Sequence, residues 1–272
     1  MSNLVERDPR VIAARFVEAR LAGRALSDYP GAIPADLDSG YAVQEHAIAA
    51  WPDEIGGWKI GRVPVEQVER LGAVRLSGPI FRRSIWIAKP EQTVEVPIYR
   101  GGFAAAEAEI VFRCARDAPA DKRDWTLDEA LDMVGAAHIG VETAGSPLAV
   151  INDLGATVVA SDFGNNAGLV LGAAVPDWRN ALEGLACTTS IDGIVVGEGR
   201  PASFADGPVE SLRFLLMHLA ARGRPLRAGA LVSTGALTGV HDIRIGQTAR
   251  CTFGALGVVV CKAASRGISN AP

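Results

Sequence analysis

The sequence predicts an α+β protein in which a small N-terminal α/β part, residues 1–75, precedes a β-rich part, residues 76–272. Two helical segments dominate the beginning of the chain. After about residue 75, short strand-like pieces are separated by Gly and Pro at close intervals, and two further helices interrupt them. Hydrophobic residues make up 49% of the 272 residues, enough for a folded core. The larger part is expected to carry the catalytic site.

The N-terminal part is predicted to hold two helices and one short strand. Pro9 suits the first position of a helix that Asp8 can cap, and Gly23 marks its end. A second helix is predicted over residues 39–50, and a strand between turns over residues 56–61.

The β-rich part is predicted to contain two helices between its strands. One helix begins at Thr126, where Glu129 completes a capping-box pattern, and ends near Gly135. The other is predicted over residues 208–222. Strands are predicted over residues 84–88, 92–98, 105–114, 138–143, 156–161, 167–175, 191–196, 230–235 and 248–262.

Composition excludes several functional classes. A net charge of −4 and the lack of a basic cluster argue against a nucleic-acid-binding protein. The apolar runs are too short to span a membrane, and the N-terminus lacks the blocks of a signal peptide, so a cytoplasmic protein is expected. The cysteines form no metal-type pair and are expected to be reduced structural thiols. They are Cys114, Cys187, Cys251 and Cys261.

Three glutamates lie in strongly apolar segments. Glu107 and Glu109 belong to residues 104–112, and Glu142 belongs to residues 138–143. Carboxylates are costly in apolar surroundings unless something compensates them. Residues i and i+2 of a strand point to the same face, so Glu107 and Glu109 should aim at one point. The alternative is an exposed strand face that carries two unpaired charges.

A hard divalent cation is the simplest compensation for these carboxylates. A ligand set of three carboxylates without His or Cys favours Mg²⁺ or Mn²⁺ over zinc. Three negative charges exceed a divalent cation by one, which leaves room for a nearby cationic side chain. Lys59, framed by glycines, is the candidate, because lysine can bind a substrate carboxylate or polarise a carbonyl. A solvated turn lysine is the alternative.

Seven short segments carry a family resemblance that covers most of the chain. They are residues 41–44, 57–61, 78–81, 106–112, 139–142, 160–165 and 229–238. In this order they resemble the fumarylacetoacetate hydrolase superfamily, and within it the branch of 2-oxopent-4-enoate hydratase and 4-oxalocrotonate decarboxylase. The resemblance implies a mixed β-roll core and a homo-oligomer. Association with a related decarboxylase or hydratase subunit stays open.

The resemblance also implies the roles of individual residues. It implies that Glu107, Glu109 and Glu142 bind Mg²⁺ or Mn²⁺ and that Lys59 lies beside the metal, where it binds substrate and takes part in catalysis. It further implies that Asp162 is catalytic.

The remaining positions have a plain structural alternative. Ser161, Thr234 and Thr238 match positions expected to bind the substrate, a small 2-oxo acid. A plain turn is the alternative for the two threonines, and a turn cap with Asn165 is the alternative for Asp162.

Several reactions are consistent with this resemblance. The leading hypothesis is a hydratase that adds water to a 2-hydroxy-dienoate or 2-oxo-enoate in aromatic catabolism. A 4-oxalocrotonate-type decarboxylase and an acylpyruvate-type C–C hydrolase are alternatives, because all three reactions stabilise an enolate. The hydrolase branch places a His–Glu pair in an N-terminal loop, where this chain offers Glu45 and His46 within a predicted helix. Hydratases usually carry an acidic residue where this chain has Leu76, which also leaves a non-catalytic partner subunit open.

Overall fold

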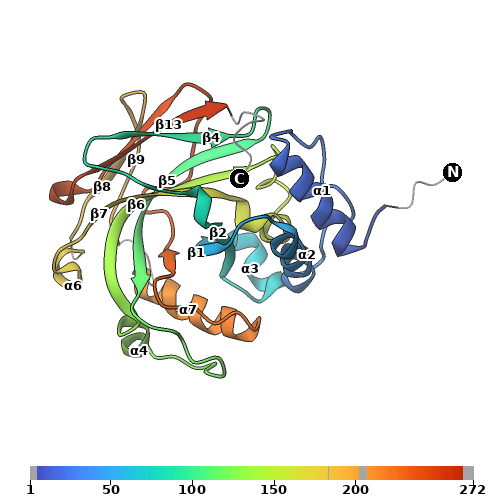
Figure 1. The fold of residues 1–272 in the computed structure, drawn as a ribbon, viewed down its shortest axis with the longest axis horizontal. Helices are drawn as coiled ribbons and strands as arrows, with labels where there is room; N and C mark the ends of the chain where they lie inside the picture. Colours follow the sequence, from blue (N-terminus) through green and yellow to red (C-terminus); the bar gives the residue numbers. More distant parts are fainter. Residues whose placement is uncertain (1–4, 183, 202–206, 266–272) are drawn as a thin grey trace.

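The computed structural model describes residues 5–182, 184–201 and 207–265. It confirms the predicted α+β class, with an eight-stranded mixed sheet, a five-stranded sheet and helices packed around them. Helices α1, α2 and α3 gather at one end of the molecule, and the strands of the smaller sheet lie toward the other (Figure 1). Among the described residues, no helix is both long and apolar enough to cross a membrane.

The helices and strands have the following bounds. The helices are α1 (Pro9–Leu21), α2 (Leu37–Ala50), α3 (Val65–Leu71), α4 (Leu127–Leu131), α5 (Ala156–Ser161), α6 (Trp178–Ala181) and α7 (Gly207–Ala221). The strands of the larger sheet are β1 (Ile55–Arg62), β2 (Arg75–Phe81), β3 (Ile85–Ile87), β5 (Phe103–Cys114), β6 (Val134–Ser146), β7 (Asn166–Ala174), β10 (Leu231–Ser233) and β11 (His241–Asp242). Those of the smaller sheet are β4 (Thr93–Ile98), β8 (Cys187–Ile191), β9 (Ile194–Gly199), β12 (Thr248–Thr252) and β13 (Val258–Ser265).

The larger sheet runs in the order β2-β1-β10-β5-β6-β7-β3, with β11 paired to β5. Its long strands β5 and β6 are antiparallel neighbours, and both are buried over most of their length. Strand β1 pairs antiparallel with β2 and parallel with β10. In this order only β10 separates β1, which carries Lys59, from β5, which carries Glu107 and Glu109.

The N-terminal helices form as the sequence predicts. Asp8 caps α1 by accepting a hydrogen bond from the Arg10 amide, with Pro9 in the first turn. Helix α2 attaches to the rest of the molecule through the buried side chain of Gln44. Its amide nitrogen donates to the carbonyl oxygens of Ser77 (3.1 Å) and Ala160 (2.6 Å).

Several local predictions need correction. Residues 156–161 form helix α5 and not a strand; the backbone of Gly155 (φ +97°) introduces it, and α5 packs against α2. The β-branched Val158 and Val159 favour a strand locally, but tertiary packing decides. The predicted strand over residues 248–262 is two strands, β12 and β13, joined by a short 3₁₀ turn. Helix α3 and strands β2 and β8 had no sequence prediction.

Gly78 on β2 allows a close approach that the site depends on. A Cβ atom at this position would lie 1.9 Å from the carbonyl oxygen of Phe163. Only glycine therefore lets the turn of Phe163–Asn165 rest directly on β2. The contact brings Asn165 to the side chain of Lys59, as described below.

The four cysteines are free and buried, as expected for structural thiols. Burial raises the pKa of Cys114 and of Cys187 to about 12 each. These thiols therefore stay protonated and unreactive at neutral pH.

Helix α7 carries an apolar stripe, as predicted, and a partly buried histidine. The ring of His218 stacks on Phe214, with centroids 5.2 Å apart, and lies 4.7 Å from the ring of Tyr41. Burial and the nearby charge of Arg222 lower the pKa of His218 to about 3. The folded protein therefore keeps this ring neutral over the whole physiological range.

The pKa of His218 predicts a loss of stability in acid. Below pH ~6.5 the unfolded chain binds a proton at this ring and the folded protein does not. The histidine's contribution to stability is thus present above pH ~6.5 and is lost as the pH falls toward 3, at up to ~1.4 kcal/mol per pH unit. The free energy of unfolding, measured in urea at pH 7 and pH 5, should fall less between the two pH values in His218→Gln than in the wild type. His46→Gln, at an exposed position of α2, should lose as much as the wild type, and an equal loss in His218→Gln would contradict the prediction.

Candidate metal and substrate site

Glu107, Glu109 and Glu142 meet at one point inside the protein. Glu107 and Glu109 lie two residues apart on β5 and share a face of the strand. Glu142 on β6 is the direct cross-strand partner of Glu107. One carboxylate oxygen from each residue lies within 4.8 Å of the others, and all three side chains are buried. The structure therefore brings the three predicted metal ligands together.

Each of two carboxylates has one oxygen held by the protein and one without a partner. Glu109 Oε2 accepts hydrogen bonds from Ser233 Oγ (2.5 Å) and the Gly235 amide (2.8 Å). Glu142 Oε1 accepts from Asn166 Nδ2 (2.9 Å). Glu109 Oε1 and Glu142 Oε2 are buried and have no hydrogen-bond partner among the described residues. Buried oxygens of this kind are expensive unless a ligand contacts them.

The electrostatics of the cluster favour a bound cation. Burial, followed by repulsion from Glu142, raises the pKa of Glu107, and burial with repulsion from both neighbours raises that of Glu109. Like charges directly opposite on paired strands are destabilising. A divalent cation would remove both penalties, and an all-oxygen donor set suits Mg²⁺, Mn²⁺ or Ca²⁺. The residues present therefore fit a metal ion.

Lys59 is the cationic side chain beside the cluster, as the sequence predicts. Its Nζ lies 3.3 Å from Glu142 Oε1 and donates to Asn165 Oδ1 at 3.1 Å. Burial alone would lower the pKa of Lys59, but the attraction of the glutamates, Glu142 first, outweighs burial and raises it. Lys59 is therefore a buried, charged ammonium and not a solvated turn lysine.

Asn165, which accepts a hydrogen bond from Lys59, lies in a strained turn. Phe163, Gly164 and Asn165 all have positive φ angles, between 55° and 63°. A left-handed conformation costs a non-glycine residue about 1–2 kcal/mol. Asn165 Nδ2 also donates to Asn152 Oδ1 (3.1 Å), so both ends of its amide are held. The turn sets the amide oxygen that orients the Lys59 ammonium.

Asp162 holds this turn through a buried ion pair with Arg20 of α1. Arg20 Nε and Nη2 donate to Asp162 Oδ1 (2.5 Å) and Oδ2 (2.9 Å). Ser146 Oγ donates to Oδ2 as well, at 2.6 Å. Both carboxylate oxygens are thus occupied, and Asp162 is not among the residues that line the cavity described next. The geometry gives Asp162 a positioning role for the turn that carries Asn165.

A cavity of about 450 Å³ adjoins the cluster. Lys59, Glu107 and Asn165 lie on its wall, and Leu76 and Thr234 also line it. Its volume suits a small organic acid. A molecule in this cavity would lie next to both the Lys59 ammonium and the Glu107 carboxylate.

The three predicted substrate-binding hydroxyls lie in different surroundings. Thr234 lines the cavity, although its hydroxyl donates to the Ile110 carbonyl at 2.8 Å. Ser161 donates to the Val158 carbonyl (2.8 Å) inside α5. Thr238 hydrogen-bonds Thr189 at 2.8 Å. Neither Ser161 nor Thr238 is part of the cavity lining.

Sequence reasoning assigned no site role to Ser233, Asn166 or Arg20. Ser233 and Asn166 each hold one glutamate, and Arg20 holds Asp162 from 142 residues away in the chain. Asn166 and Ser233 had local signals, because Asn166 directly follows the Asp162–Asn165 motif and Ser233 lies in the segment 229–238 that carries the family resemblance. The contacts of Ser233 and Arg20 become visible only when β10 and α1 are placed beside the site.

Comparison with known proteins agrees with this geometry. No model of a known protein family matches the sequence. The chain is 26% identical over 253 residues to a 2-keto-4-pentenoate hydratase of Burkholderia vietnamiensis, covering 91% of this chain and 94% of the hydratase. It is 24% identical over 253 residues to a 4-oxalocrotonate decarboxylase of a Pseudomonas species, covering 90% and 94%.

Solved structures share the fold. The 4-oxalocrotonate decarboxylase from Pseudomonas putida G7, complexed with magnesium and adipate, superposes with a TM-score of 0.75 at 19% identity, covering 94% of this chain and 97% of that one. Fumarylpyruvate hydrolase from Pseudomonas aeruginosa, complexed with Mn²⁺ and pyruvate, gives a TM-score of 0.57 at 15% identity, covering 79% and 91%.

The fold indicates the superfamily, and the sequence similarity indicates the branch. The protein has the fold of the fumarylacetoacetate hydrolase superfamily. Its sequence is similar over about nine-tenths of its length to proteins of the hydratase and decarboxylase branch, which supports the resemblance that its motifs indicate. The prediction of an enzyme of the lyase class is confirmed by these relationships.

Removal of any one carboxylate should abolish divalent-metal binding. Glu107→Gln, Glu109→Gln and Glu142→Gln each keep the side-chain volume but remove a charged ligand. Calorimetric titration with Mg²⁺ and Mn²⁺ should show binding to the wild type and none to the three variants. Glu95→Gln, at an exposed position of β4, is the matched control and should bind as the wild type does. Unchanged affinity in the three variants would rule out this metal site.

Proposed function

We propose that this protein is a divalent-metal-dependent hydratase that adds water to a 2-hydroxy-dienoate or 2-oxo-enoate in aromatic catabolism. The observation that carries the proposal is the buried cluster of Glu107, Glu109 and Glu142 beside Lys59 on a cavity of about 450 Å³. Relatives named 2-keto-4-pentenoate hydratase, at 25–26% identity over about nine-tenths of the chain, support it.

The three glutamates would hold the metal, with Mg²⁺ or Mn²⁺ as the proposed ion. When bound, such an ion supplies Lewis-acid stabilisation of negative charge that develops on a substrate oxygen. Ser233 and the Gly235 amide fix Glu109, and Asn166 fixes Glu142, so two of the ligands are oriented before any ion arrives. Such outer partners commonly tune the affinity of a metal site.

Lys59 would bind the anionic end of the substrate. Its ammonium is charged, buried and oriented by Asn165, and it borders the cavity. A fixed cation in water-poor surroundings binds a carboxylate and stabilises charge that develops nearby. Contact between Lys59 and the substrate, which the family resemblance implies, is therefore part of the proposed function.

Decarboxylation of a dicarboxylic 2-oxo acid is the second candidate, and the opposite cavity wall favours it. Arg62 and Arg75, cross-strand partners on β1 and β2, both line the cavity. Leu76 lines it where hydratases usually carry an acid. Arginines suit a second carboxylate, and loss of CO₂ needs no acid at Leu76 to activate water.

The C–C hydrolase alternative has less support. Glu45 lies on α2 and is paired with Arg222 (2.5 Å) and Arg224 (2.7 Å). Neither Glu45 nor His46 is among the cavity-lining residues.

Product identity tests the proposed function. The protein would be incubated with 2-hydroxypenta-2,4-dienoate, 4-oxalocrotonate or acetylpyruvate in the presence of Mg²⁺ or Mn²⁺, and the products would be weighed by mass spectrometry. Gain of water by the dienoate supports the hydratase, and loss of CO₂ from 4-oxalocrotonate supports the decarboxylase. Cleavage of acetylpyruvate would favour the hydrolase. Turnover of none would favour a non-catalytic partner subunit of a homologous enzyme.

Lys59→Ala should lower turnover of the accepted substrate by at least ~100-fold, the order expected for loss of one positioned electrostatic group. Steady-state kinetics at saturating metal ion would measure the loss. Lys262→Ala removes an exposed lysine of β13 and should leave turnover unchanged. Turnover near that of the wild type in Lys59→Ala would remove this lysine from the mechanism.

A further inference from the structure

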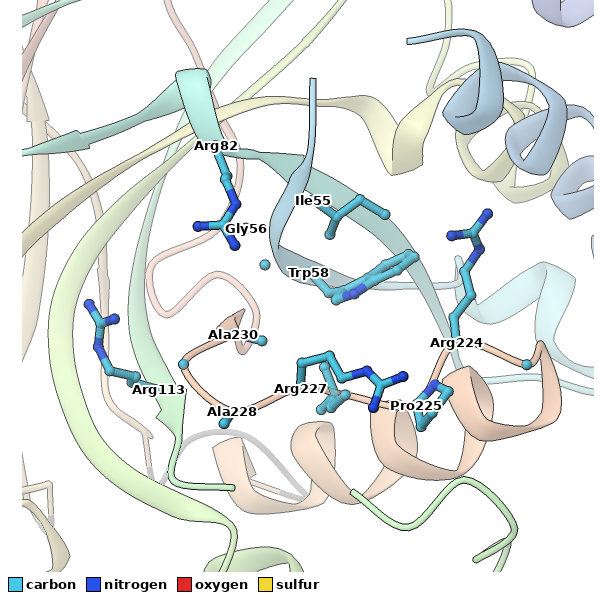
Figure 2. A pocket seen from close by; sticks show the side chains of 14 residues that line it. Ile55, Gly56, Trp58, Arg82, Arg113, Arg224, Pro225, Arg227, Ala228 and Ala230 are labelled. Carbon is cyan, nitrogen blue, oxygen red and sulfur yellow. The ribbon is translucent and has the colours of Figure 1, made fainter. Parts of the chain in front are cut away.

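A second cavity, of about 530 Å³, lies apart from the metal site. The beginning of β1, the residue that follows β2, one residue of β5 and the segment from 223 to 230 after α7 enclose it (Figure 2). Trp58 lines this cavity, whereas its neighbour Lys59 lines the metal-site cavity. Residues 55–58 of β1 belong to the lining of this cavity, and residues 59–62 belong to the lining of the metal-site cavity. The two cavities therefore adjoin different ends of the same strand.

The charged residues that line this second cavity are all arginines. They are Arg82, Arg113, Arg224 and Arg227. Figure 2 shows Arg82, Arg113 and Arg227 on three sides of the pocket, with Trp58 beside them. No described residue of the lining is acidic, although the whole chain has a net charge of −4. Cations gathered in a hollow of an acidic protein raise the local concentration of anions.

The partners of these arginines leave the pocket with excess positive charge. The side chain of Arg113 has no hydrogen-bond or ion-pair partner among the described residues, whereas its backbone belongs to the sheet. Arg224 shares Glu45 with Arg222, so one carboxylate faces two cations. Arg82 pairs with Glu54 (3.1 Å) and Arg227 pairs with Asp117 (3.1 Å), both at exposed positions. Exposed pairs of this kind contribute little, and an incoming anion can compete with them.

The floor of the pocket indicates the kind of anion. Ile55 and Pro225 contribute partly exposed apolar lining between the arginines, with Trp58 and Leu226 largely buried beside them. An inorganic ion would leave that surface without a partner, whereas a small organic molecule could cover it. Arginine forks bind carboxylate and phosphate groups through paired hydrogen bonds.

We propose that this arginine-lined pocket binds a small organic molecule that carries two or more carboxylate or phosphate groups, at a site separate from the metal-site cavity. The anionic groups bind Arg113 and Arg227, and the carbon skeleton lies against Ile55 and Pro225. The site does not depend on the metal cluster or on the reaction proposed above. A ligand there would contact the strand that holds Lys59.

Calorimetric titration of the Mg²⁺-loaded protein would test this proposal. Tricarballylate and fructose 1,6-bisphosphate are the probes, since they distinguish a carboxylate from a phosphate ligand, and acetate and pyrophosphate are the single-charge and inorganic controls. At least one organic polyanion should bind more tightly than both controls, and Arg113→Gln should weaken it by about tenfold or more, the range for loss of one hydrogen-bonded charge. Arg113→Gln/Arg227→Gln should bind none.

Arg250→Gln is the charge control, because it removes one positive charge from β12 of the smaller sheet and breaks an exposed ion pair with Glu91, as loss of Arg227 breaks the pair with Asp117. It should bind the probe as the wild type does, and thermal unfolding would confirm that all variants fold. Equal affinity in the wild type and the double variant would place the anion elsewhere and overturn the proposal. If Arg250→Gln lost as much affinity for the probe as Arg113→Gln does, the loss would reflect the net charge of the protein, and the proposal would be overturned. A change of oligomeric state in the double variant, without anion binding to the wild type, would assign the arginines to a subunit contact instead.

Discussion

The placement of three carboxylates on two paired, buried strands is the constraint around which the site is organised. Glu107 and Glu142 are direct cross-strand partners, and Glu109 is two residues from Glu107 on the same face. Their mutual repulsion opposes folding, and one lysine offsets it only in part. The surrounding hydrogen bonds do not neutralise this charge. They fix one oxygen of Glu109 and one of Glu142 and leave the other oxygen of each without a partner, which is the arrangement a cation requires.

The precision of this arrangement depends on residues far away in the chain. Arg20 on α1 binds Asp162, and Asp162 begins a turn in which three successive residues have positive φ angles. Gly78 lets that turn rest on β2. The conformational strain of the turn is tolerated because a buried ion pair and a backbone contact determine its position from two sides. Asn165 is thereby held where it can orient Lys59, so the first helix contributes to the site without touching it.

The parts of the site that follow from local periodicity could be predicted from the sequence. Glu107 and Glu109 share a face because a strand repeats every two residues, and their apolar flanks indicate burial. The contacts that Ser233 and Arg20 make could not be predicted, because they depend on which strand pairs with β5 and where α1 packs. The same limit explains helix α5, where two valines favour a strand and packing against α2 selects the helix. Local pattern identifies the charged groups, and tertiary contacts decide what holds them.

In the proposed function, the choice between hydration and decarboxylation would depend on the residues that line the cavity together with Glu107. Among the described lining residues, Glu107 is the only carboxylate, and the proposed metal would engage it. A hydratase with Leu76 at the position of the usual acid would therefore move its proton through water, the Lys59 ammonium or a hydroxyl such as that of Thr234. A decarboxylase needs no such acid for the loss of CO₂, and Arg62 and Arg75 offer a second carboxylate a partner. The proposed metal site would serve both reactions, so the residues of β1 and β2 that line the same cavity would determine which reaction follows.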